Sequence, residues 1–168
     1  MRPELFQLSG CNCTSIFQSI RFRYSRSVSK KSGRIAALIE SSAGGCWDAH
    51  YLGYFRCFNE GLYFEAHDVL EELWLRDRKG PNYAFHKGLI QLAGAFVHLQ
   101  KERLRPAVAL YDLADANFRR YPGRHDGIDL QSVREMAQRW RNAVAESGFS
   151  ENPLKKWAAP RLELPANS

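Results

Sequence analysis

Residues 63–74, "YFEAHDVLEELW", place five ionisable side chains within twelve residues that have the apolar spacing of a helix. At about 100° per residue the apolar side chains share one arc, which we expect to face the core. His67 and Glu71 are four residues apart, so they are neighbours at the border of that arc. At such a border a helix either passes from the dry core to solvent or lines a cleft. Three carboxylates fall on the opposite side, where we expect solvent: Glu65, Asp68 and Glu72.

The next helical stretch, residues 83–101, is apolar nearly all round, which is typical of a central, buried helix. Lys87, Gln91 and His98 nevertheless share one narrow stripe of it. A buried polar group without a partner costs about 1–3 kcal/mol, so this stripe needs partners, and the nearest are the histidine and glutamate of the preceding stretch. We therefore predict one interhelical cluster with Lys87 at its rim: His67, Glu71, Gln91 and His98.

Several functions for this cluster are open. It could be a satisfied structural network, or it could line a pocket for a small molecule. A hydrolase could use Glu71 to orient His67 as a general base, or could hold a divalent transition metal on His67, Glu71 and His98. A helical protein-interaction module is a further alternative. His67 and Glu71 have the spacing His-x-x-x-Glu, however, and neither the paired Glu-x-x-His of di-iron bundles nor H-E-x-x-H, G-x-S-x-G or a glycine-rich phosphate loop is present.

The same apolar spacing predicts helices along the chain and no strands. We expect a short helix near residue 35 and five longer ones, separated by turns with glycine, proline or asparagine: 48–60, 62–76, 83–101, 106–121 and 130–146. Connections this short make neighbouring helices antiparallel. The expected fold is therefore all-α, a single-domain antiparallel bundle of about five helices over residues 34–148.

Four smaller features complete this expectation. Asn82 and Asp129 are placed to cap the helices that follow them. Residues 124–129 are expected to form a loop. Residues 149–168 contain three prolines and are expected to be an irregular tail, in which Trp157 and Leu162 pack back on the body.

Charge and hydropathy restrict the partners. No window approaches eighteen uninterrupted apolar residues, so no membrane span is expected. The formal net charge of +6 comes wholly from residues 1–39, which hold seven basic residues and one acidic residue, whereas residues 40–168 hold 17 of each. We therefore expect no nucleic-acid binding by the body of the protein. A small molecule, a protein partner and a homo-oligomer all stay open.

Residues 1–33 form a basic extension rich in serine and arginine, which we expect to be disordered or a targeting segment. It could be a transit peptide, a basic arm or an extension from an upstream start codon. The expected location is the cytoplasm, or a plastid or mitochondrion if this segment is a transit peptide. The four cysteines, at positions 11, 13, 46 and 57, match no zinc-finger spacing and are expected to be reduced, with Cys57 buried.

The two helical stretches resemble DUF309, a family of small all-helical proteins of unknown function. The resemblance covers about residues 50–130, and it implies an α-helical bundle without supplying an activity. Lys87 stands where the family pattern leads us to expect a neutral amide, so its charge is not expected to matter, and residues before about 34 fall outside the pattern. Two motifs carry the resemblance: Phe58, Asn59, Gly61, Tyr63, Phe64, Glu65, Ala66, His67, Asp68, Glu71 and Trp74, then Gly88, Leu89, Ile90, Gln91 and His98.

Overall fold

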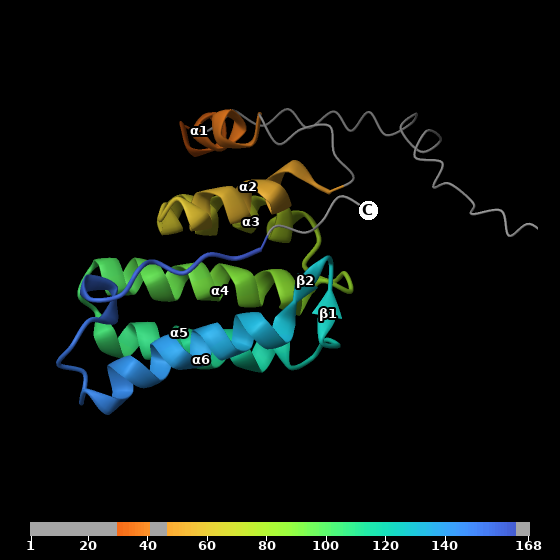
Figure 1. The fold of residues 1–168 in the computed structure, drawn as a ribbon. Helices are drawn as coiled ribbons and strands as arrows, with labels where there is room; N and C mark the ends of the chain where they lie inside the picture. The colour runs from red at the N-terminus through yellow and green to blue at the C-terminus, as the bar shows by residue number, and fades with distance from the viewer. Residues whose placement is uncertain (1–29, 41–46, 164–168) are drawn as a thin grey trace, which may run out of the picture.

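The computed structural model describes residues 30–40 and 47–163 of the chain. Within these ranges the chain forms six α-helices, one 3₁₀ helix and one small hairpin (Figure 1). The predicted all-α bundle is confirmed, and most of the predicted extension, residues 1–29, lies outside the described residues. The helices are α1 (Lys30–Ile39), α2 (Ala49–Asn59), α3 (Tyr63–Arg76), α4 (Tyr83–Gln100), α5 (Leu104–Phe118) and α6 (Leu130–Glu146).

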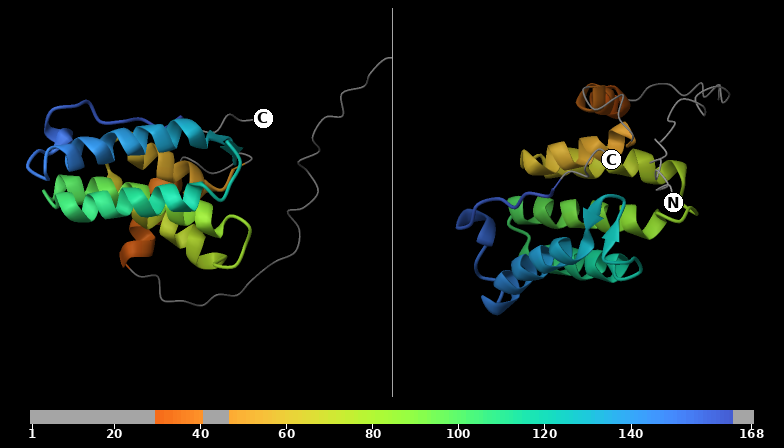
Figure 2. Two further views of the ribbon diagram at one scale, coloured as in Figure 1. Left: turned by 90° about the horizontal axis from the view of Figure 1, so that it is seen from below. Right: turned by 45° about the vertical axis from the view of Figure 1, so that its right-hand side comes forward.

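Helix α4 lies between the other helices, with α2 and α3 on one side and α5 and α6 on the other (Figures 1 and 2). Contacts along α4 and α5 run in opposite residue order, since Gly88 meets Phe118 whereas Gly94 meets Leu110. The two helices are therefore antiparallel, as predicted. A Cβ atom on Gly88 would lie 2.7 Å from Cε1 of Phe118, so this glycine permits the close approach of the helices.

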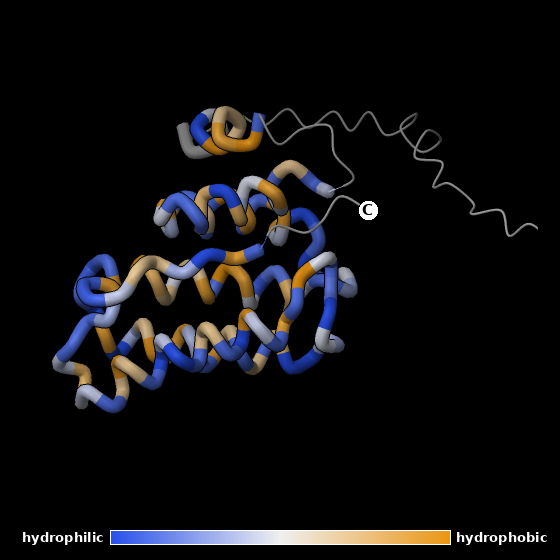
Figure 3. The backbone as a smooth tube through the Cα atoms, in the orientation of Figure 1, coloured by the Kyte–Doolittle hydropathy of each residue, from blue (hydrophilic) through white to orange (hydrophobic). Residues whose placement is uncertain are grey.

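The core is centred on one aromatic ring of α4. The side chain of Phe96 has no exposed surface. Its ring centroid lies 5.3 Å from that of Phe58 on α2, 4.8 Å from Tyr63 on α3, 5.6 Å from Tyr111 on α5 and 5.0 Å from Trp140 on α6. Phe96 thus contacts one ring from each of four other helices. Around this centre, hydrophobic and hydrophilic residues alternate along the helices, as amphipathic packing requires (Figure 3).

The segment 124–129 corrects the prediction of a loop. It forms a small antiparallel hairpin of β1 (Arg124–His125) and β2 (Ile128–Asp129). The two residues between the strands, Asp126 and Gly127, have φ angles of 44° and 78°. Left-handed conformations at both positions are those of the tight turn that matches the twist of a hairpin. Two residues per strand are too few to leave an alternating pattern in the sequence, so the strands were missed.

One of the two predicted helix caps is confirmed and the other is wrong. Oδ1 of Asp129 accepts hydrogen bonds from the backbone N–H groups of Gln131 and Ser132, at 2.9 and 3.4 Å. Asn82 makes no side-chain cap to α4. Its amide instead donates to the carboxylate of Asp126, and its Oδ1 lies 2.9 Å from Nε2 of His125. Asn82 therefore ties the hairpin to the start of α4.

Residues 150–162, here called the C-terminal arm, contain only the 3₁₀ helix η2 (Pro153–Lys155) and otherwise no regular structure. The arm is fixed at both ends. Nδ2 of Asn152 donates to the carbonyl of Leu99 at 2.7 Å, and the backbone of Leu162 exchanges two hydrogen bonds with the Asn59 amide, at 2.8 and 2.7 Å. Leu162 is buried and Trp157 packs on Trp140, so the predicted return of the tail to the body is confirmed.

Cys57 is a buried free thiol, as predicted. No helix of the described residues has the length and apolar character needed to span a bilayer.

Replacing the central ring tests its importance. Phe96→Ala should lower the free energy of unfolding by about 3–5 kcal/mol, because it removes a fully buried ring and leaves a cavity. Phe64→Ala is the matched control, since Phe64 is 48% exposed and its loss should cost about 1 kcal/mol or less. Urea unfolding followed by circular dichroism measures both values. Equal losses in the two variants would contradict the central role of Phe96.

Candidate functional site

The site is built on α3, whose apolar arc faces the core as predicted. Tyr63, Ala66, Val69 and Leu70 are buried. Leu62, which directly precedes the first helical residue, is 39% exposed. The packing of this arc fixes the rotation of α3 and so determines which polar side chains reach the surface.

The structure brings His67 and Glu71 together and adds Asp68. One potential ligand atom from each of the three residues lies within 4.8 Å of the other two. Nδ1 of His67 is 3.2 Å from Oδ1 of Asp68. The side chain of His67 is 33% exposed and that of Asp68 is 15% exposed, so the group lies at a partly covered surface.

Asp68 is a correction to the sequence interpretation, which placed it on the solvent side of the helix. A helical wheel gives the direction of each Cβ atom, 100° apart for successive residues, but not where the end of the side chain lies. The carboxylate of Asp68 reaches the imidazole of the preceding residue. The adjacency of histidine and aspartate in the sequence was the available signal.

The other two carboxylates that we expected on the solvent side of α3, Glu65 and Glu72, are also less exposed than predicted. The side chain of Glu65 is 19% exposed and forms an ion pair with Arg34 of α1. The side chain of Glu72 is 24% exposed, and its Oε2 lies 3.5 Å from Nε2 of His50 on α2. The prediction of a solvated face is therefore wrong, because α1 and α2 pack against this side of α3.

His50 joins α2 to the end of α3 in a polar network that the sequence did not reveal. Its Nδ1 lies 3.0 Å from Oδ1 of Asp48, and its Nε2 lies 2.9 Å from Nη2 of Arg76. Since an arginine N–H can only donate, Nε2 of His50 accepts and Nδ1 carries the proton toward Asp48. This hydrogen bond from His50 is the main reason that the pKa of Asp48 lies below its ordinary value. The network satisfies a histidine that is 7% exposed.

The polar stripe of α4 is directed partly toward α5. Oε1 of Gln91 accepts a hydrogen bond of 2.7 Å from Nδ2 of Asn117, which is 8% exposed. Nδ1 of His98 is buried and has no hydrogen-bond partner within the described part of the chain. Nζ of Lys87 lies 5.7 Å from the centre of the Tyr83 ring. The hydrogen-bond partner of Gln91 is therefore on α5, whereas the sequence led us to expect a partner on α3. A direct contact of Gln91 or His98 with His67 stays a prediction.

Asn117 was not among the predicted site residues. It follows Ala114 by three residues and precedes Phe118, and both of these are buried, so it lies on the apolar arc of α5. An amide on such an arc needs a partner. The position of this amide on an apolar arc could have predicted that Asn117 has a buried polar partner, which the structure shows to be Gln91.

The Gln91–Asn117 pair should contribute measurably to stability. Asn117→Ala should lower the free energy of unfolding by about 1–3 kcal/mol, because it leaves the part-buried side-chain carbonyl of Gln91 without its donor. Asn142→Ala is the control, since the Asn142 amide accepts from Gln138 on the exposed surface of α6. Urea unfolding compares the two. A loss no larger than that of the control would show that Gln91 finds another partner.

The unpartnered His98 should make stability depend on pH. Burial, with smaller effects of Arg103 and Lys101, lowers the pKa of His98. The unfolded histidine, with a pKa of about 6.5, then binds more protons than the folded one, so the free energy of unfolding decreases as the pH falls through that value. Burial also lowers the pKa of His86, which adds to the effect in the same direction.

Urea unfolding between about pH 5 and pH 8 measures this dependence. His98→Gln should reduce the slope, and His86→Gln should reduce it further when the two are combined. A slope that is the same in the wild type and in the double variant would contradict the assignment to these two histidines.

Comparison with known proteins finds one family model that is similar to this part of the chain. Residues 51–117 match the sequence model of DUF309, a domain of unknown function. The match includes all of α3 and α4, and with them every residue of the predicted cluster. No curated protein and no solved structure matches the chain. This match over residues 51–117 confirms the resemblance seen in the two motifs.

Proposed function

We propose that the DUF309 domain of this protein binds a divalent transition metal through His67, Asp68 and Glu71. The observation that carries the proposal is that one donor atom from each residue lies within 4.8 Å of the others on a single face of α3. The sequence suggested His98 as the third ligand. The closeness of Asp68 to His67 makes Asp68 the better candidate.

The donor set suits a first-row metal. One imidazole nitrogen and two carboxylate oxygens are ligands that Zn²⁺, Mn²⁺ and Fe²⁺ accept. Three protein donors leave coordination positions for water, as in catalytic sites and unlike closed structural sites. A metal in such a site supplies a Lewis acid and lowers the pKa of a bound water, which is the chemistry of a hydrolase.

The surroundings of the group agree with access for a substrate. The His67 side chain is one-third exposed. Phe64, which is three residues earlier and therefore on the same side of the helix, is 48% exposed. Nζ of Lys101 lies 5.8 Å from the centre of the Phe64 ring. An apolar ring and a cation beside the donor atoms would favour an anionic substrate with an apolar portion.

A second candidate function needs no metal and uses only two of these residues, His67 and Asp68. The 3.2 Å separation between His67 Nδ1 and Asp68 Oδ1 would let the carboxylate hold the proton on Nδ1. Nε2 would then be free to accept a proton as a general base. This alternative needs His67 and Asp68 but no metal, so metal binding separates the two functions.

Metal titration tests the proposal. Protein without a histidine tag should bind Zn²⁺ or Mn²⁺ with one-to-one stoichiometry in isothermal titration calorimetry. At a free metal concentration of 100 Kd, the free energy of unfolding should rise by about 2.7 kcal/mol, and chelation should reverse the rise. His67→Gln and Glu71→Gln should weaken binding by about tenfold or more, since each removes a ligand.

Glu65→Gln is the matched control, because Glu65 is a carboxylate of the same helix that is paired with Arg34 instead. The control should bind metal like the wild type. Absence of stoichiometric binding, or equal weakening by all three substitutions, would contradict the metal site. If His67→Gln and Glu71→Gln destabilise the metal-free protein more than the control does, the group is a structural network.

A further inference from the structure

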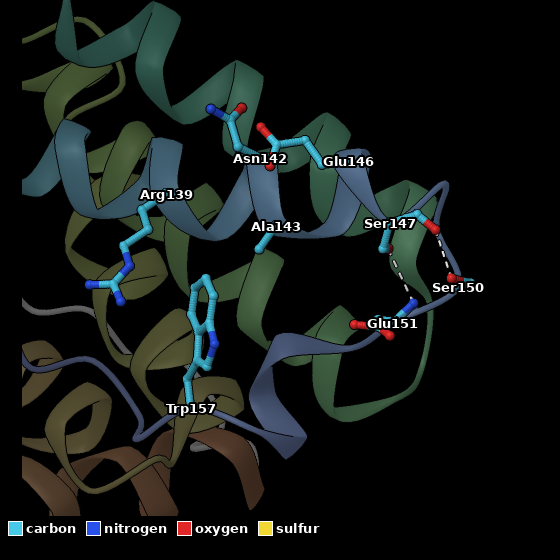
Figure 4. A pocket seen from close by; sticks show the side chains of 8 residues that line it. All are labelled: Arg139, Asn142, Ala143, Glu146, Ser147, Ser150, Glu151 and Trp157. Atoms are coloured by element: carbon cyan, nitrogen blue, oxygen red, sulfur yellow. Dashed lines mark hydrogen bonds between the residues drawn. The ribbon is translucent and has the colours of Figure 1, made fainter.

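Two hollows lie along α6 where the C-terminal arm passes over it, and they share the side chains of Arg139 and Trp157. One has a volume of about 680 Å³ and the other about 580 Å³. Both are within the range of small-molecule sites. Figure 4 shows the first, with Arg139 on one side of the Trp157 indole and Ser147, Ser150 and Glu151 on the other.

The two hollows differ in charge. Glu146, Glu151 and Arg139 line the larger one, so its ionisable groups sum to one negative charge, and we call it the acidic hollow. Arg139, Arg161 and Glu135 line the smaller one, which carries one positive charge, and we call it the basic hollow. The basic hollow therefore favours an anion more than the acidic hollow does, where Glu151 is already paired with Lys156 at 2.7 Å.

Arg139 differs from the other arginines of α6 that face a neighbouring element. Arg134 and Arg141 point to α5, where Asp115 and Asp112 bind them at 2.7 and 2.9 Å. Arg139 points to the arm, and its guanidinium carbon lies 4.8 Å from the centre of the Trp157 ring. Neither Arg139 nor Arg161 of the basic hollow has a carboxylate partner within residues 30–40 and 47–163.

The basic hollow is held in shape by contacts of Trp157, which lines it, and by the anchored ends of the arm. Trp157 packs edge-on against Trp140 at 5.2 Å, and its backbone N–H donates to the carbonyl of Pro153 at 2.9 Å. The arm is anchored at Asn152 and again at Leu162, on either side of Trp157. An indole fixed in this way needs little ordering when a ligand binds, which favours affinity.

We infer that the basic hollow binds a small aromatic carboxylate. The ligand carboxylate would be held by the guanidinium groups of Arg139 and Arg161, whose planar donors match its two oxygens. The ligand ring would lie on the apolar surface of Met136, Trp157 and Pro160. The side chains that line the basic hollow carry one net positive charge, which favours a ligand with one negative charge over a phosphate dianion. This site is separate from the proposed metal site on α3 and does not depend on it.

Fluorine NMR of 4-fluorophenylacetate added to the full chain tests the inference. The neutral isostere 4-fluorophenylacetamide has the same ring and size without the charge. The acid should show a saturable shift, and the amide should bind about tenfold more weakly or not at all, because a charge-assisted hydrogen bond is lost. The variants His67→Gln and Glu71→Gln, which each lack one proposed metal ligand, should bind the acid like the wild type.

Arg161→Gln is the decisive variant, since the exposed Arg161 side chain holds no part of the described fold in place. It should weaken binding of the acid by about tenfold. Arg141→Gln is the matched control, because Arg141 is on α6 but is paired with Asp112 outside the hollow. No saturable binding, equal binding of acid and amide, or an Arg161→Gln variant that binds like the Arg141→Gln control would each overturn the inference.

Discussion

The packing of four aromatic rings around Phe96 is the constraint on which the rest of the structure depends. Tyr63 stacks on Phe96 with ring centroids 4.8 Å apart and planes at 26°, which fixes the rotation of α3. His67 follows Tyr63 by one helical turn, so its side chain must lie beside Tyr63 at the edge of the core. On the opposite side, Trp140 joins Phe96 to Trp157 of the arm. One chain of rings thus positions both the donor group of α3 and the hollow beside α6.

Burial of polar groups near this core sets a second constraint. The hydroxyl of Tyr54 donates to the carbonyl of Leu89 at 2.8 Å. The hydroxyls of Tyr63 and Tyr111, in contrast, are buried without a hydrogen-bond partner among the described residues. Burial raises the pKa of Tyr63 to about 12, so this hydroxyl is neutral at ordinary pH. The aromatic packing therefore outweighs a cost of about 1–3 kcal/mol for each unpaired hydroxyl. That balance shows how strongly the rings determine the position of α3 and α5.

The sequence predicted the features that depend on spacing and missed those that depend on direction. Helical periodicity gave the bundle, and the four-residue spacing of His67 and Glu71 gave their proximity. Periodicity could not show which of two neighbours a polar stripe on α4 faces, because α4 packs against both α3 and α5. The observed partner of Gln91, Asn117, therefore lies on α5, whereas the sequence interpretation looked for partners on α3. Asn82 was read as a local cap because its tertiary partners in the hairpin are more than forty residues away.

Both proposed sites lie at the border of the core, and their charged groups are not part of the ring packing. The proposed metal ligands His67 and Asp68 of α3 are partly exposed, and the residues that hold α3 in place are buried on its other face. Arg161 is exposed, while the arm that carries it is fixed by Asn152 and Leu162. We therefore expect the removal of one of these charged groups to leave the ring packing intact. Binding and folding can vary independently in this molecule because the fold is determined by residues such as Phe96 that never reach the surface.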